Sequence, residues 1–84
     1  LKLLYININY LINVIMEEWK VRVVNEFKEL NNKVEKLWNF VHKDPKFEKL
    51  DNTERKLLLR QLTGMTTYLD ALEDRLEYYK IKVD

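Results

Sequence analysis

The sequence predicts an all-α fold: a helical hairpin of two long antiparallel helices with short flanking helical segments. One Gly and one Pro among 84 residues leave too little turn material for an all-β fold. Two stretches, 17–43 and 51–83, carry apolar residues at alternating spacings of three and four, the period of one helix face. About ten residues join them, which favours an αα-hairpin.

The first helix is predicted from Glu17 to Lys43. Its apolar stripe comprises Trp19, Val23, Phe27, Leu30, Val34, Leu37 and Val41. The acidic residues Glu17 and Glu18 lie in its first turn, where the helix dipole favours them, and cations lie in its last turn. Asp44-Pro45 ends it, because proline disfavours helix in the residue before it. Residues 44–49 are predicted to form a short helical turn, since proline also suits a first helical position.

The second helix is predicted to begin at Asp51, which with Glu54 resembles a capping box. Its stripe comprises Leu58, Leu62, Met65, Leu69, Leu72, Leu76, Tyr79 and Val83, and is close to a heptad seam. Gly64 interrupts this helix at a cost of about 1 kcal/mol relative to Ala. Such a glycine usually marks a bend or a close backbone approach.

Residues 1–15 differ from the rest, with one charge, three Asn and otherwise apolar or Tyr residues. The segment is too short for a membrane span of about 20 apolar residues. Its alternation over Tyr5–Tyr10 is strand-like. Because Met16 directly precedes the first charged, periodic stretch, we hypothesise that it is the native start. Residues 1–15 would then be an N-terminal extension and 16–84 the single helical domain.

The composition points to self-association. There are no cysteines and one histidine, His42, which excludes disulfides and thiolate or multi-histidine metal sites. A chain of 84 residues builds a thin core and usually needs such a staple or a partner subunit. Apolar residues outside the two stripes are available for that partner: Val24, Trp38, Phe40, Leu57, Leu59, Tyr68 and Tyr78.

Charge and motifs exclude several function classes. The formal net charge is +1, whereas a duplex DNA binder normally has a basic excess. No nucleophile elbow, glycine-rich phosphate loop or histidine-rich metal pattern is present. The carboxylate pairs Glu26/Glu29 and Glu73/Glu77 are interpreted as solvent-facing partners of Lys and Arg, and His42 as a surface residue that complements the helix dipole.

One cluster on the first helix is a candidate for ligand binding. A flat aromatic such as Trp19 can stack on nucleobases, and Arg22, Lys33 and Lys36 can pair with phosphate oxygens. Lys33 and Lys36 share a helix face. The structural alternative is that Trp19 belongs to the core or an interface while the cations are solvated.

Residues 19–37 resemble the first helix of the phage anti-CBASS cyclic-oligonucleotide sponges. The pattern in this chain is Trp19-x-x-Arg22-Val23, Glu26, Glu29-Leu30, Lys33-Val34 and Leu37. The order of Phe47, Leu50, Leu57-Leu58, Gln61, Met65, Tyr68 and Arg75 extends the resemblance to about residues 17–80.

The resemblance implies a homohexamer that sequesters cyclic messengers in the host bacterial cytoplasm without cleaving them. Ligands such as cyclic GMP-AMP or cyclic tri-AMP would bind between protomers, with no cofactor, metal, DNA, RNA polymer or membrane involved. Trp19 matches the family's base-stacking aromatic, and Lys33, with Lys36 as the alternative, matches its phosphate-binding lysine. Arg75 matches the arginine of a separate trinucleotide site.

Two other function classes remain open at this stage. A helical module could bind a host protein through the aromatics outside the stripes. An enzyme could degrade the same messengers, although no catalytic constellation is present in the sequence.

Overall fold

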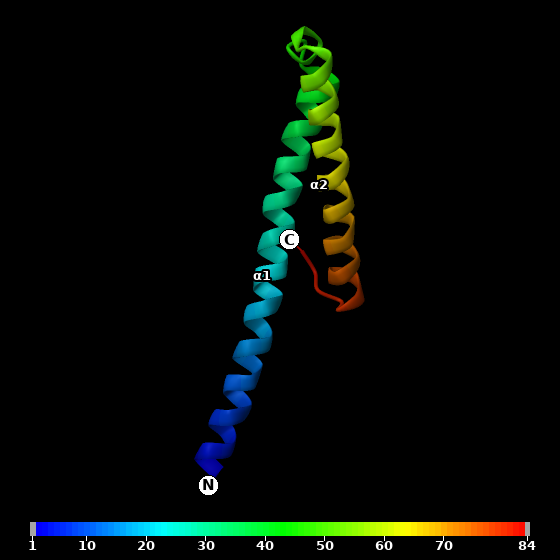
Figure 1. The fold of residues 1–84 in the computed structure, drawn as a ribbon. Coiled ribbons are helices and arrows are strands. Elements are labelled where there is room, and N and C mark those ends of the chain that lie inside the picture. Colours follow the sequence, from blue (N-terminus) through cyan, green and yellow to red (C-terminus); the bar gives the residue numbers. More distant parts are fainter. Residues whose placement is uncertain (1, 84) are drawn as a thin grey trace.

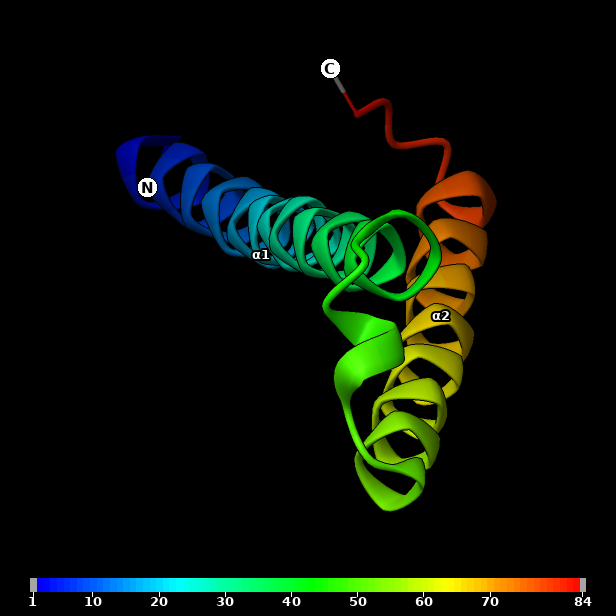
Figure 2. The ribbon, with the colours of Figure 1, turned by 90° about the horizontal axis from the view of Figure 1, so that it is seen from above.

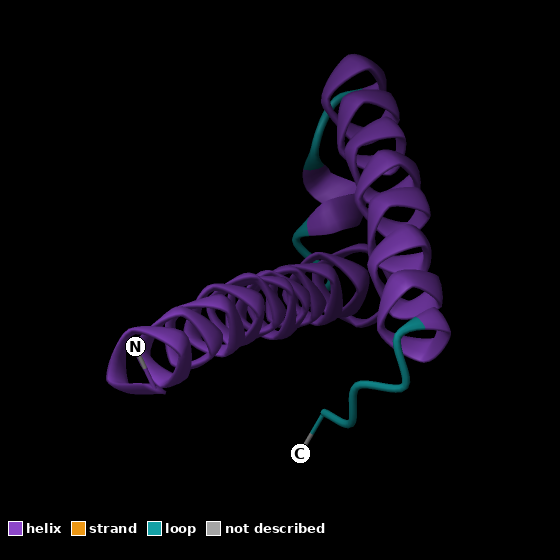
Figure 3. Cartoon of the chain, turned by 90° about the horizontal axis from the view of Figure 1, so that it is seen from below, coloured by secondary structure: helices purple, strands orange, loops and turns teal. Residues whose placement is uncertain are grey.

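Two antiparallel helices and one turn of 3-10 helix make up the protein (Figure 1). The computed structural model describes the backbone of residues 2–83 and the side chains of residues 11 and 18–83. Helix α1 spans Lys2–Lys43, the 3-10 turn η1 spans Phe47–Lys49, and α2 spans Asn52–Tyr78. Over residues 2–83 the only other structure is loop and turn (Figure 3). The predicted all-α hairpin is confirmed.

Helix α1 is longer than predicted, because it begins at Lys2 and not at Glu17. The strand-like alternation over Tyr5–Tyr10 therefore does not produce a strand. A strand needs a neighbouring strand to satisfy its backbone groups, and residues 2–83 supply none. Extending an existing helix needs no new nucleus, so residues 2–15 continue α1 despite their pattern. The side chain of Glu17 lies outside the described residues, and the hypothesis that Met16 is the native start stays a prediction.

The connector is fixed by local hydrogen bonds. The Asp44 carboxylate accepts from the Lys46 N–H at 2.9 Å, and the Asp44 carbonyl accepts from the Phe47 N–H at 3.1 Å. Phe47 is buried, with its ring edge-on to that of Phe40 at 6.1 Å between centroids. The helical turn predicted within 44–49 is confirmed as η1, anchored by one aromatic pair.

Both ends of α2 have defined caps. The Asp51 side chain accepts from the Glu54 N–H at 2.8 Å, as the sequence predicted. At the other end the Ile81 N–H donates to the Leu76 carbonyl at 2.8 Å, and the Lys80 N–H donates to the Glu77 carbonyl at 3.0 Å. This is a Schellman motif, with Lys80 in the left-handed region at φ 55°. The helix thus ends at Tyr78, and the predicted continuation to Val83 is wrong.

The core lies between the two predicted stripes. We call the stripe residues within α2 the inner row, which comprises Leu58, Leu62, Met65, Leu69, Leu72 and Leu76. Leu72 is 1% exposed and forms a buried cluster with Val23 and Leu76. Although Ile81 and Val83 lie beyond the helix, they still pack against this cluster. The tail therefore covers the open end of the hairpin core.

The molecule is a rod and not a sphere. Its extents are 69 × 18 × 17 Å, and its radius of gyration is 19.5 Å where a compact domain of this length has about 12 Å. At 1.5 Å per residue, α1 is about 63 Å long and α2 about 40 Å, so the N-terminal part of α1 extends past α2 (Figure 1). Seen along the long axis, the two helices are inclined to each other (Figure 2).

This shape leaves an unusual amount of surface in solvent. The accessible surface is 7227 Å², whereas a compact 10.3 kDa monomer has about 5,400 Å². Among the predicted partner-binding residues, the exposed ones are Trp38, Leu57, Leu59, Tyr68 and Tyr78. Val24 and Phe40 are half-buried, because Val24 packs on the core cluster and Phe40 on Phe47. Those two residues are therefore only partly available to a partner.

Candidate functional site

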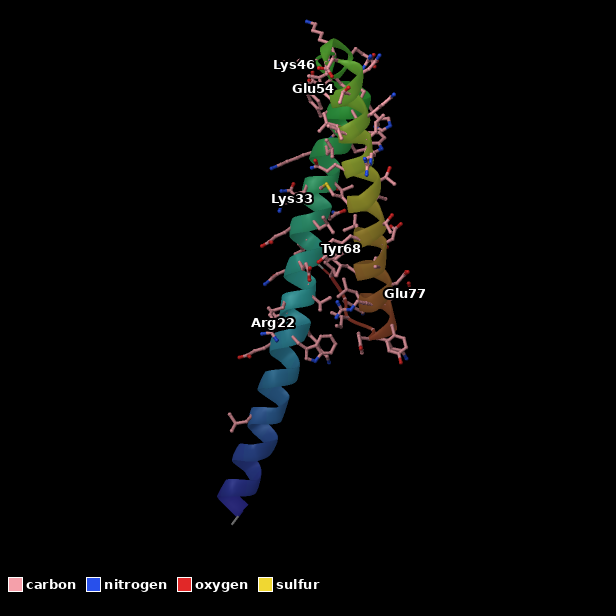
Figure 4. The ribbon with its side chains drawn as sticks, in the orientation of Figure 1. Arg22, Lys33, Lys46, Glu54, Tyr68 and Glu77 are labelled. Atoms are coloured by element: carbon pink, nitrogen blue, oxygen red, sulfur yellow. The ribbon has the colours of Figure 1, made fainter. Side chains whose placement is uncertain are left out.

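Three of the five predicted ligand-binding residues lie in one row along α1. At helical spacing, Arg22, Lys33 and Lys36 fall on the same flank, and all three are exposed. In Figure 4, Arg22 and Lys33 are seen on the side of α1 opposite α2. The carboxylates Glu26 and Glu29 continue the row between Arg22 and Lys33 and are also exposed, as predicted. They separate Arg22 at one end of the row from Lys33 and Lys36 at the other end, which we call the lysine-rich stretch.

The lysine-rich stretch borders an open depression of about 530 Å³. Its lining residues are Lys36, Asn39, Phe40, Lys43, Asp44 and Pro45. The Phe40 ring is held by its edge-on contact with Phe47, while Lys36 and Lys43 lie one turn before and after it. The Lys43 ammonium lies 5.5 Å from the centroid of the Trp38 ring, so Phe40 and Lys36 are the pair that can accept a flat anionic group, by packing on one side and by charge on the other.

Sequence reasoning missed part of this depression. Phe40 was assigned to a partner interface, and Asn39 and Lys43 were not considered as ligand-binding residues. The available signal was their spacing from Lys36, because residues three, four and seven positions along a helix share its face. The missing information was Phe47, which lies on a different element and fixes Phe40 from the side.

Trp19 occupies a different environment from the lysines. It is half-buried and packs against the Val23–Leu72–Leu76 cluster. Its ring also meets that of Tyr79, at 4.8 Å between centroids and 73° between planes. Much of the Trp19 surface is therefore part of the core, as in the alternative in which Trp19 does not bind a ligand. Only the part that remains exposed is available to a base.

Arg75 lies at the same end of the hairpin as Trp19. It is exposed on the last turns of α2, next to Leu76 of the core cluster, and its carbonyl accepts from the Tyr79 N–H at 3.1 Å. Arg75 and Trp19 are thus linked through Tyr79. The five predicted residues form two groups, with Trp19, Arg22 and Arg75 at the open end and Lys33 and Lys36 nearer the connector.

The separation of these groups is too large for one small ligand. Trp19 and Lys33 are 14 positions apart on one continuous helix, which corresponds to about 21 Å along its axis. A cyclic molecule with two bases does not reach across that distance. Within one chain the structure therefore does not bring the predicted stacking residue Trp19 and the predicted phosphate-binding residue Lys33 together.

Other site types are absent from the part of the chain that the structure describes. No three His, Cys, Asp or Glu residues gather there as a metal site would need. Glu73 and Glu77 are exposed, as is His42, whose Nδ1 is 3.0 Å from the Trp38 carbonyl oxygen. No described helix combines the length and apolarity needed to cross a membrane.

Comparisons with known proteins place the chain in a family. No curated protein and no solved structure matches it. The family model Sequestin matches residues 17–78, which run from the start of the predicted first helix to the end of α2. This match includes the α1 row, the inner row and all five predicted ligand-binding residues. The chain belongs to the Sequestin family, the anti-CBASS cyclic-nucleotide sponges.

Proposed function

We propose that this protein binds cyclic di- or trinucleotide messengers of bacterial CBASS immunity and sequesters them intact. It acts in the host cytoplasm as a homohexamer, with its ligands held between protomers. One observation carries the proposal beyond family membership: the stacking aromatic and the phosphate-binding lysine are about 21 Å apart on one rigid helix. Trp19 and Lys33 can serve one small ligand only if they come from different chains.

Because of symmetry, such a site needs few different residues. A two-fold axis through a cyclic dinucleotide gives each base one Trp19 and each phosphate one Lys33, because every contact is repeated by the partner. Stacking contributes about 1–3 kcal/mol per base. A charge-assisted hydrogen bond contributes about 1.5–3 kcal/mol. Two copies of each are enough for tight binding without a metal or a nucleophile.

Arg75 is proposed to serve the trinucleotide site. It lies at the open end of the hairpin, whereas Lys33 lies nearer the connector, so a ligand that contacts Arg75 from several protomers occupies a different place from one held by Lys33. Arg22 and Lys36 are proposed as flanking phosphate contacts. Lys36 also borders the depression at Phe40, which gives a bound nucleotide an apolar surface beside the cation.

Calorimetry with a panel of cyclic oligonucleotides tests the function. We expect at least one member to bind more tightly than micromolar, and mass spectrometry of the recovered ligand to find it intact. Failure of every member to bind would refute the proposal, and recovered linear product would indicate an enzyme. Pull-down from host lysate that recovers a stoichiometric protein and no nucleotide would favour the host-protein module.

The structure refines the variants for the dinucleotide site. Trp19→Ala opens a cavity in the core, so Trp19→Leu is the better change, because it keeps apolar packing and removes the stacking plane. Trp19→Leu and Lys33→Ala are each expected to weaken dinucleotide binding at least tenfold. The matched controls are Trp38→Leu, an exposed tryptophan elsewhere on α1, and Lys28→Ala, an exposed lysine on another flank. Equal losses in controls and variants would exclude the site assignment.

A mixing experiment tests whether the site lies between chains. Trp19→Leu protein carries an intact Lys33, and Lys33→Ala protein carries an intact Trp19. If the two residues meet across a boundary, co-refolded mixtures contain half-sites in which both are native, and binding partly recovers. No recovery in the mixture would mean that the two residues do not share a ligand across chains.

A further inference from the structure

Helix α2 carries a second row of residues at heptad spacing, and this row faces solvent. Its members, all exposed, are Leu57, Gln61, Gly64, Tyr68, Ala71 and Arg75. Tyr78 continues the row into the last turn and is 79% exposed. We call these seven residues the outer row. It precedes the inner row by one residue at each position, so it lies about 100° around the helix from the face that α1 covers.

Two small residues flank Tyr68, the exposed middle residue of the outer row. A Cβ built on Gly64 meets nothing within 4 Å, so the close approach predicted for this glycine is not made within the chain. Ala71, two turns further on, is also small and exposed. Bulkier apolar groups lie towards the two ends, where Leu57 is 55% exposed. Small residues on either side of Tyr68, with larger ones towards the two ends, leave room for side chains of another helix.

To within one position, the outer row is symmetric about Tyr68: Gln61 and Arg75 are seven residues away on either side, whereas the separations within each of the other two pairs differ by one residue. Reversing the chain direction around that residue places Gly64 opposite Ala71 and Leu57 opposite Tyr78. It also places Gln61 opposite Arg75. An identical antiparallel helix can therefore match this row to within one position, with Tyr68 of both copies at the two-fold axis.

The charges beside the outer row also favour an antiparallel orientation of the second helix. Arg60 and Asp74 are exposed next to the row, seven positions either side of Thr67. Neither forms an ion pair with any side chain that the structure describes. An antiparallel second copy puts Arg60 beside Asp74 of the other chain twice, whereas a parallel copy puts like charges together. Lys56 near the start of α2 and Glu77 near its end repeat this division, while Glu54 in the first turn and Arg75 in the last turn have the opposite order (Figure 4 labels Glu54 and Glu77).

We propose that the outer row is the contact surface for a second copy of this chain, packed antiparallel about a two-fold axis at Tyr68. This inference rests on the proposed self-association and not on the proposed ligand. The chain as a whole exposes about 1,800 Å² more than a compact monomer, and each partner in a standard interface contributes about 800 Å². The contact buries Leu57, Tyr68 and Tyr78, which the hairpin leaves in water.

A charge exchange across the axis tests the orientation. Arg60→Glu places glutamate beside Asp74 of the other copy, and Asp74→Arg places arginine beside Arg60. Each variant alone is expected to raise the dissociation constant of this contact at least tenfold in sedimentation equilibrium without nucleotide. An equimolar mixture of the two restores association, because every facing pair is then of opposite sign. Variants that associate like the unmodified chain, or a mixture no better than its components, would overturn the antiparallel contact.

Two matched substitutions separate this surface from the rest of α2. Leu57→Gln removes an apolar side chain from the outer row, and Leu59→Gln makes the same change two residues away on the other side of the helix, where Leu59 is 42% exposed. Only Leu57→Gln is expected to weaken association. Gly64→Gln adds a side chain where the hairpin has open space, so it leaves helicity intact and blocks close approach. Equal effects at Leu57 and Leu59 would contradict the proposal.

Calorimetry on the same samples separates this inference from the proposed function. If the charge variants associate normally while the unmodified chain binds a cyclic nucleotide, the outer row is not the contact and the function stands. If the unmodified chain is monomeric and binds no cyclic nucleotide, both proposals fail.

Discussion

The inner and outer rows of α2 have the same spacing and run side by side along one helix, yet α1 covers only one of them. The inner row consists of leucines and one methionine, and four of its leucines are buried. The outer row mixes Leu57 and two tyrosines with Gln61, Gly64, Ala71 and Arg75, all of them exposed. A helix face made only of apolar residues is buried in the core of its own protomer. A mixed face of the same period stays soluble in the monomer and suits reversible contact with another chain.

The largest test of this contrast is a leucine truncation in each row. Leu72→Ala removes a side chain that is 1% exposed and should lower the free energy of unfolding by about 2–5 kcal/mol. Leu57→Ala, at protein concentrations where the chain is monomeric, should change it by no more than about 0.5 kcal/mol. Urea denaturation followed by circular dichroism measures both. Similar losses at the two positions would mean that the rows do not differ as the structure indicates.

The cap of α2 determines where both rows begin. Asp51→Ala removes the acceptor for the Glu54 N–H and should lower the free energy of unfolding by about 1 kcal/mol. Asp51→Asn keeps a side-chain oxygen and serves as the matched control. If both variants lost equal stability, the charge and not the hydrogen bond would be the source of the effect.

A stabilising change is expected at the centre of the outer row. Gly64→Ala reduces the freedom of the unfolded chain and meets open space in the folded one, so the free energy of unfolding should rise by about 0.5–1 kcal/mol. Thermal unfolding of dilute, monomeric protein measures it. A decrease under those conditions would show that the hairpin already packs something against this glycine.

The smallest expected effect lies where the inner row ends. Lys80 has φ 55°, and Lys80→Gly removes the steric cost of that conformation. The greater freedom of the unfolded glycine chain offsets part of the gain, leaving a net stabilisation of a few tenths of a kcal/mol. Lys82→Gly in the tail is the control, and it should not stabilise. A destabilised Lys80→Gly variant would mean that the lysine side chain contributes to the tail's position over the core.

Much of the candidate site follows from spacing along a single helix. Arg22, Lys33 and Lys36 are predicted to be exposed on α1 and are found so, because residue spacing within a continuous helix fixes which residues share a flank. Trp19 shows the limit of that reasoning. Its neighbour Tyr79 comes from the far end of the sequence, and spacing within α1 says nothing about which residue of another element covers a given side chain.

The sequence by itself determined the two helices, the cap at Asp51, the turn after Asp44 and the residues of the core. Each of these depends on interactions within a few residues or on apolar periodicity, which are local properties of the chain. The tertiary structure alone decided that Ile81 and Val83 cover the end of the core and that Phe47 fixes Phe40. It also set the Trp19 ring against the ring of Tyr79. These outcomes required the relative positions of residues far apart in sequence, which no local pattern contains.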